Sequence, residues 1–234
     1  MKAILIKELK SYFMSPLGYV FMGVFILINA FFFINGPIAY GVADIGSLFS
    51  NVNVIFLFLI SILTMRLLSE EKNKKTDQLL LTAPVKVSDI VLGKYFAAVC
   101  VFLITLAVSM VFPITLFIFG DPPLGECIGG YFGFILLWGA LISVGVFISS
   151  LTENQMISAV FTFGVLLLIN FFDYIASSIS NEKISKVVSS LSLFKRYGDF
   201  ETGILNIANV IFFISFIFVF LFLTVKVIEK RRYS

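Results

Sequence analysis

Histidine is absent from the 234 residues, and only two cysteines occur. Zinc metalloprotease motifs, serine–histidine nucleophile pairs and histidine-ligated haem all need an imidazole, so the sequence excludes these classes of site. Two cysteines are too few for a disulfide framework. No G-x-x-x-x-G-K-[ST] motif occurs either, which excludes ATP binding by a P-loop on this chain.

Charge is also scarce: 13% of the residues are charged and 59% are hydrophobic, and the mean hydropathy is +1.05. A soluble domain of this length cannot bury so much apolar surface, so lipid must be the solvent. Six charge-free segments are each long enough to cross a hydrocarbon core of about 30 Å. They predict an all-α integral membrane domain over residues 1–234, with six transmembrane helices near residues 17–35, 48–65, 95–119, 128–149, 156–173 and 206–226.

Lysine and arginine are unevenly divided between the two ends of these predicted spans. With both termini on one side, thirteen of these cations lie on that side, and the four on the other are Lys183, Lys186, Lys195 and Arg196. Because cytoplasmic loops carry the excess of Lys and Arg, the distribution predicts a multi-pass plasma (inner) membrane protein with both termini in the cytoplasm. The net charge of +3 is too small to suggest nucleic acid as a partner.

Residues 1–15 form a separate unit ahead of the first predicted span. The apolar residues of this unit share one helical face: Ile4, Leu5, Leu9, Tyr12 and Phe13. Pro16 interrupts the pattern before the spanning run begins. The pattern predicts an amphipathic helix in the membrane interface. A cleaved signal peptide is the alternative, but no convincing small-x-small cleavage site follows.

Ten charged residues crowd into residues 66–94, between the second and third predicted spans. Residues 76–81 predict a short helix, which Pro84 cannot continue. Ser88 is predicted to cap a second helix, with Asp89 in its first turn. A helix, a break and a second helix beneath the membrane suit a rigid lever. A positive-inside anchor that only sets topology is the alternative interpretation.

Several residues of this segment follow a recognisable spacing: Glu71, Thr76, Leu79, Leu80, Pro84, Gly93 and Lys94. The spacing resembles the pattern E…GT…LL…P…GK of exporter-type ABC permeases, the ABC-two membrane family. The resemblance covers essentially the whole chain, and the most similar branch looks like the permeases of gliding motility and of nitrous-oxide-reductase maturation. One departure precedes Thr76, where the family usually has glycine and this chain has Lys75, which puts the local turn in question.

The resemblance implies that the segment is a cytoplasmic coupling helix. In that family the corresponding loop sits in a groove of a separate ATP-binding subunit and transmits closure of its nucleotide sites to the spans. The residues implied to form or brace this contact are Glu70, Glu71, Thr76, Leu79, Leu80, Pro84, Gly93 and Lys94. ATP and Mg²⁺ would be bound by the partner ATPase. This chain would then hold no cofactor or metal, would not be an enzyme, and would pair with a second, identical or paralogous permease subunit.

Residues 174–205, between the fifth and sixth predicted spans, carry a short amphipathic pattern. Its apolar positions are Ile184, Val187, Val188 and Leu191. An exposed surface helix is one interpretation of this pattern. The family resemblance implies instead short extracellular re-entrant helices that cap the outer mouth of the pathway, with these four residues as gate candidates. Lys195, Arg196 and residues 199–201 would then line the rim.

Small residues recur in the fourth predicted span. Gly129 and Gly133 form a GxxxG motif, and Gly139, Ser143 and Gly145 continue it. Small faces allow helix backbones to approach closely in lipid. Packing within the chain is the favoured interpretation. A face between two permease subunits is the alternative, although the first and fifth spans are better candidates for that role.

Ionisable residues are missing from the middle of every predicted span. Ion-coupled carriers keep such groups as relays, because only function offsets the cost of a charge in lipid. Their absence argues against coupling to protons or sodium. The lack of histidine and of a convergent acid–base set argues against a membrane enzyme. Pro113 predicts a kink in the third span.

The leading hypothesis is therefore a permease subunit that uses ATP hydrolysis by a separate subunit to move or export a substrate. The alternative is a mechanotransmission or scaffold subunit that acts on an extracytoplasmic partner while nothing crosses the membrane. Neither composition nor spacing identifies the substrate.

Overall fold

Every regular element in the described part of the chain is a helix, as predicted. The computed structural model describes residues 1–41, 53–76, 85–120, 122–172 and 192–233. The helices in chain order are α1 (Lys2–Met14), α2 (Pro16–Phe33), the π-helix η1 (Ile34–Ile38), α4 (Asn53–Thr64), α5 (Ser69–Asn73), α7 (Val87–Ser109), α8 (Val111–Phe119), α9 (Leu124–Leu151), α10 (Gln155–Asn170), α13 (Leu193–Glu201) and α14 (Ile207–Tyr233).

Four helical segments among the described residues are long and apolar enough to cross a membrane: Pro16–Ile38, Val87–Phe119, Leu124–Leu151 and Ile207–Arg231. They correspond to the first, third, fourth and sixth predicted spans. α10 is apolar but has only 16 residues, fewer than the 20 or so that a helix needs to span the hydrocarbon core. α4 follows residues 42–52, which lie outside the described part. The full count of six spans therefore stays a prediction.

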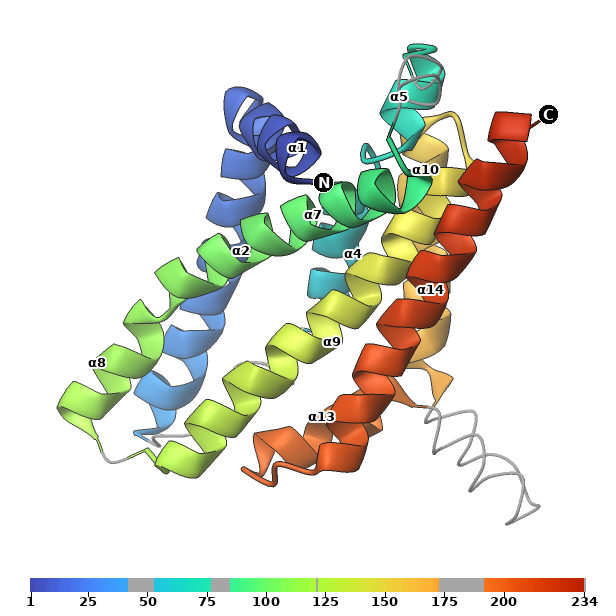
Figure 1. Ribbon diagram of the computed structural model, residues 1–234. Coiled ribbons are helices and arrows are strands. Elements are labelled where there is room, and N and C mark those ends of the chain that lie inside the picture. The colour runs from blue at the N-terminus through green and yellow to red at the C-terminus, as the bar shows by residue number, and fades with distance from the viewer. Residues whose placement is uncertain (42–52, 77–84, 121, 173–191, 234) are drawn as a thin grey trace.

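The helices form one bundle, with α1, α5 and the end of α14 at the same end of the molecule (Figure 1). α9 runs through the middle, where α4, α7, α10, α13 and α14 all contact it. After the short connection 152–154, α10 returns antiparallel beside α9, as the shortness of that connection predicted. α1 packs against α7, and this contact brings the N-terminal helix to residues 66–94, which follow α4 and which we call the charged segment.

The third span begins earlier than predicted. Ser88 is not the helix cap, because Lys86 holds the cap position with an extended backbone (ψ 139°) and Ser88 lies inside the first turn of α7. The second helix predicted beneath the membrane and the third span are thus one continuous helix. Met110 separates α7 from α8, three residues before the buried Pro113. Since proline cannot donate to the carbonyl four residues earlier, this interruption lies where the kink was expected.

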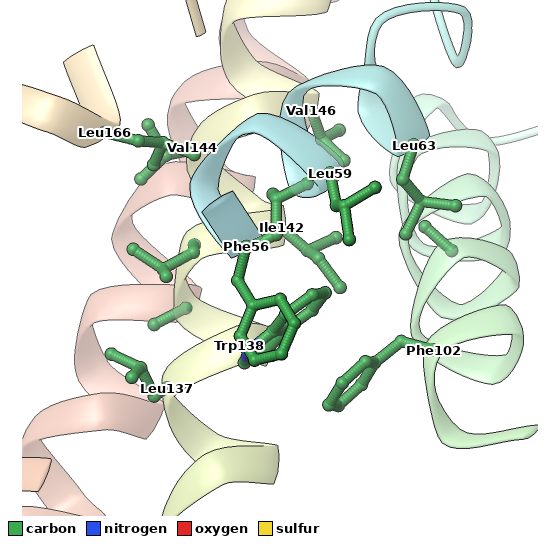
Figure 2. Packing of buried hydrophobic residues seen from close by; sticks show 14 of the residues in the cluster. Phe56, Leu59, Leu63, Phe102, Leu137, Trp138, Ile142, Val144, Val146 and Leu166 are labelled. Carbon is green, nitrogen blue, oxygen red and sulfur yellow. The ribbon is translucent and has the colours of Figure 1, made fainter. Parts of the chain in front are cut away.

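In the bundle core, Trp138 of α9 lies with Phe56 and Phe102 among aliphatic side chains (Figure 2). The Trp138 ring stacks on Phe102 of α7, with centroids 4.4 Å apart and planes inclined by 9°. Phe56 of α4 and Phe25 of α2 meet the same ring edge-on, at 5.5 and 5.6 Å. Such ring pairs contribute about 0.5–1.5 kcal/mol each beyond the area that they bury. In lipid, where apolar burial does not drive helices together, this packing joins the four helices.

The small residues of α9 pack within the chain. A Cβ added at Gly129 would lie 2.6 Å from the carbonyl oxygen of Phe200 in α13, and one at Gly133 would lie 2.5 Å from the Phe200 Cβ. A Cβ at Gly145 would overlap the hydroxyl of Thr64 in α4. Packing within the chain is therefore the correct interpretation of the motif, because these faces are already covered.

The segment predicted to cap the outer mouth is described only from residue 192 onward. The four gate candidates lie outside the described residues: Ile184, Val187, Val188 and Leu191. Of the predicted rim, Arg196 donates to the Asn209 Oδ1 at 2.8 Å, and Asp199 accepts from the Asn209 Nδ2 at 2.7 Å. These bonds tie α13 to the start of α14. Re-entrant helices and a gate stay predictions.

Candidate functional site

α5 ends in a left-handed C-terminal turn. The Thr76 N–H donates to the Glu71 carbonyl at 2.9 Å, and the Lys75 N–H donates to the Lys72 carbonyl at 3.1 Å. This pair of bonds closes a helix whose next residue adopts the left-handed conformation. Here that residue is Lys75, with φ of +56°. The turn is therefore kept without glycine, and its geometry explains why glycine suits this position in the pattern.

The helix predicted over residues 76–81 lies almost wholly outside the described part of the chain. Of the predicted stretch 76–81 only Thr76 is described, and Thr76 is not helical. Among the described residues of the segment, α5 lies ahead of that stretch, at Ser69–Asn73, with Glu70 and Glu71 in its first turn. Acidic residues in that turn complement the positive end of the helix dipole.

Replacing Lys75 by glycine is expected to stabilise the protein by about 0.5–1 kcal/mol. A side chain in the left-handed region costs roughly 1–2 kcal/mol, whereas the added freedom of glycine in the unfolded chain costs roughly 0.5–1 kcal/mol. The check is thermal unfolding in detergent, followed by the fluorescence of Trp138, the single tryptophan. Lys74→Gly is the matched control, because Lys74 is right-handed (φ −81°) and should lose stability. A loss in both variants would contradict the assignment of the turn.

Lys94 of α7 is a buried cation, with a side chain only 1% exposed. Its Nζ lies 3.0 Å from the Glu8 Oε1 of α1 and 2.9 Å from the Glu71 Oε2 of α5. It also donates to the Leu67 carbonyl at 2.6 Å. Three acceptors thus match the three hydrogens of the ammonium group. Since an unpaired buried charge costs several kcal/mol, burial of Lys94 holds α1, α5 and α7 in one arrangement.

A second lysine completes what we call the ionic cluster, the four residues Lys7, Glu8, Glu71 and Lys94. The Lys7 Nζ lies 3.1 Å from the Glu71 Oε1 and 3.9 Å from the Glu8 Oε1. Two ammonium groups therefore face two carboxylates, and the cluster has no net charge. Lys7 is exposed, so solvent screens its contribution, whereas Lys94 is shielded.

Arg66 forms a second link between the charged segment and α1. Its Nε lies 3.2 Å from the Glu70 Oε2, and its guanidinium donates to the hydroxyls of Ser15, at 2.9 Å, and Ser11. The guanidinium carbon also lies 5.1 Å from the centre of the buried Tyr12 ring. The planar fork of arginine suits this combination of a carboxylate, hydroxyls and a ring face.

The pKa of Glu70 lies below its ordinary value of 4.5. Partial burial would raise this pKa, but the hydrogen bond from Lys74 and the charge of Arg66 together outweigh burial. A carboxylate with a lowered folded-state pKa contributes stability that is present above the unfolded value. That contribution is lost as the pH falls through the folded value, which here means a loss only in the acid range below about pH 4.5.

Close backbone contacts fix the same region from two further sides. A Cβ at Gly93 would lie 3.0 Å from the Ile4 side chain, so glycine lets α1 approach α7. On the other side, the Ser149 hydroxyl at the end of α9 accepts from the N–H groups of Leu68 and Ser69, each at 3.1 Å. The start of the charged segment is thus anchored on α1, α7 and α9.

The structure brings together most of the predicted contact residues that it describes. Glu70, Glu71, Thr76 and Lys94 line one cavity of about 170 Å³, and Gly93 precedes Lys94 under α1. The other predicted contact residues lie outside the described part: Leu79, Leu80 and Pro84.

Glu8 was not among the residues predicted from the sequence, and its side chain points into the α1–α7 contact. The signal for it was available. Glu8 lies four residues after Ile4 and four before Tyr12, on the apolar face of the amphipathic helix. A single acid on such a face indicates a buried partner of opposite charge. The apolar face predicted for residues 1–15 is therefore corrected: Glu8 and Tyr12 are its buried residues.

The fold and the site together define a helical, multi-pass membrane protein whose charged segment is anchored on the ends of its spans. A family model described as "ABC-2 family transporter protein" matches residues 3–232, and the chain belongs to that family. It is thus a membrane subunit that partners a separate ATP-binding subunit, in a family whose members form dimeric arrangements. No curated protein matches the sequence.

Proposed function

We propose that this chain is the permease subunit of an ABC transporter, in which residues 66–94 receive the movement of the ATPase subunit and pass it to the spans. The observation that carries this proposal is the burial of Lys94 between Glu8 and Glu71. A loop that only set topology would not need a neutralised, buried contact with two other helices. A lever needs such a contact, because a loosely packed connection would move by itself and leave the spans in place.

The connections from the ionic cluster lead directly into two spans. Lys94 belongs to α7, which is continuous from Val87 to Ser109, so a displaced base moves the span as far as the interruption at Met110. Glu8 belongs to α1, and Ser15 alone separates α1 from α2. A displacement of α5 would thus reach the first and third spans as a rigid-body motion.

The substrate pathway is proposed to lie between two permease subunits rather than within one chain. Aromatic and aliphatic side chains around Trp138 fill the centre of the described bundle (Figure 2). α2 and α10 instead carry many exposed apolar side chains. These are the first and fifth predicted spans, which the sequence favours for the contact with a second subunit.

The coupling proposal is tested with Glu71→Gln in nanodiscs that hold the permease and its ATPase. This variant removes one partner of Lys94 and keeps the other, Glu8, so insertion and folding should survive. The readout is the nucleotide-dependent change in distance between spin labels on α2 and α10. We expect the wild type to show this change, and the variant to hydrolyse ATP while losing most of it.

Lys74→Gln is the matched control, since Lys74 is 63% exposed and, within the described residues, its ion pair is with Glu70 at i,i+4 spacing. It should retain the distance change. If Glu71→Gln retains the change as well, residues 66–94 do not act as the lever. If the change occurs but no compound crosses the membrane of sealed vesicles, the mechanotransmission alternative replaces export.

A further inference from the structure

We propose that the end of α1 and Arg66 form a binding site for the headgroup phosphate of an anionic phospholipid. A hollow of about 550 Å³ lies where α1 turns into α2. Its polar lining consists of Lys7, Lys10, Ser11, Ser15, Arg66 and Glu70. The inference goes beyond the proposed function and does not depend on the ATPase.

In this lining Lys7 pairs with Glu71 and Arg66 pairs with Glu70, so Lys10 is the cation left to attract an anion. Lys10 is exposed and has no hydrogen bond or ion pair to any residue in the described part of the chain. Arg66, by contrast, is held in place by Glu70, Ser11 and Ser15. A fixed guanidinium beside an uncommitted ammonium is a combination suited to phosphate oxygens.

The hydroxyl of Ser11 adds a neutral donor to this pair. Its oxygen accepts a hydrogen bond from Arg66, so its own hydrogen remains available to a ligand. The arrangement thus offers one phosphate group an ammonium and a hydroxyl from α1 and a guanidinium from the turn after α4, where Arg66 lies 55 residues after Ser11. A surface that is merely basic would attract anions without three donor groups meeting at one place.

The surroundings favour a lipid over a soluble phosphate. The spanning segment Pro16–Ile38 begins one residue after Ser15, so the hollow lies at headgroup level in the leaflet on the side of α1. Met14 also lines the hollow and is 87% exposed. Beside an acyl chain that side chain buries its apolar surface, which it cannot do against water. Tyr19, exposed in the first turns of α2, belongs to the residue types enriched at membrane interfaces.

The test is native mass spectrometry of the detergent-purified chain titrated with phosphatidylglycerol or phosphatidylcholine. We expect the first phosphatidylglycerol to bind more tightly than phosphatidylcholine, and Lys10→Gln to weaken that binding about fivefold, the effect of one basic residue at an anionic surface. Lys2→Gln is the matched control, because Lys2 lies on the same helix and is also exposed but does not line the hollow. It should leave the binding unchanged.

Three results would overturn the proposal. Equal weakening by Lys2→Gln and Lys10→Gln would show diffuse charge attraction without a site. Displacement of the bound lipid by excess glycerol 1-phosphate would show a site for soluble phosphate. No preference for phosphatidylglycerol in the wild type would show that no anion is selected. A Ser11→Ala variant supplies a second test that leaves net charge unchanged, and it should weaken phosphatidylglycerol binding in the same direction.

Discussion

Lys94→Met is expected to destabilise the protein by about 3–5 kcal/mol, the usual cost of breaking a buried ion pair from one side. Methionine has a similar length, so the loss arises from charge rather than from a cavity. Glu8 would remain buried and Glu71 partly buried, with the exposed Lys7 as their remaining cationic partner in the described part of the chain. Unfolding in detergent, followed by Trp138 fluorescence, measures the loss. For a chain of this size it corresponds to roughly 6–20 °C in Tm.

Two comparisons separate this prediction from a general effect of mutation. Lys74→Met removes an exposed partner of Glu70 at i,i+4 spacing and should cost less than about 0.5 kcal/mol. Glu8→Gln combined with Lys94→Met restores a neutral cluster, so the double variant should lose less than the sum of the two single losses. Additive losses would mean that Glu8 and Lys94 are not coupled.

The sequence led to the predicted contact residues in 66–94, but not to the way in which the described ones are held. Glu71, Thr76 and Lys94 could be found because the family pattern is a matter of spacing along the chain. The partner of Lys94 could not be found in that way, since Glu8 is 86 residues away. Hydrophobic periodicity reports which face of a helix is buried, and carries no information on which other helix covers that face.

The boundary of the third span shows a related limit. The sequence prediction starts the span at residue 95 because an exposed cation normally ends an apolar run. Lys94 is instead buried and neutralised, so it belongs to the interior of α7 and the helix extends back to Val87. At Lys75 the sequence located the feature correctly but could not give its backbone conformation. The family pattern indicated the turn, and only the backbone shows that a lysine is held in it.

Gly129→Ala is expected to destabilise the protein by about 1–2 kcal/mol, although alanine is the better helix former. The added Cβ would lie 2.6 Å from the Phe200 carbonyl oxygen and 3.1 Å from the Gly203 Cα. Both obstacles are backbone atoms, so α13 itself has to shift away from α9. Overpacking of this kind costs typically 1–3 kcal/mol, which exceeds the gain of up to about 1 kcal/mol in helix propensity.

The neighbouring residue provides the control, because a Cβ at Gly130 would meet no atom within 4 Å. Gly130→Ala should therefore show the propensity gain alone and stabilise the protein by up to about 1 kcal/mol. The two variants differ by one position on the same helix, and Trp138 fluorescence measures both. Opposite signs are the expected result, since Gly129 faces α13 and Gly130 does not. If both variants change the free energy of unfolding in the same direction, close contact between α9 and α13 does not determine which residue is tolerated in the motif.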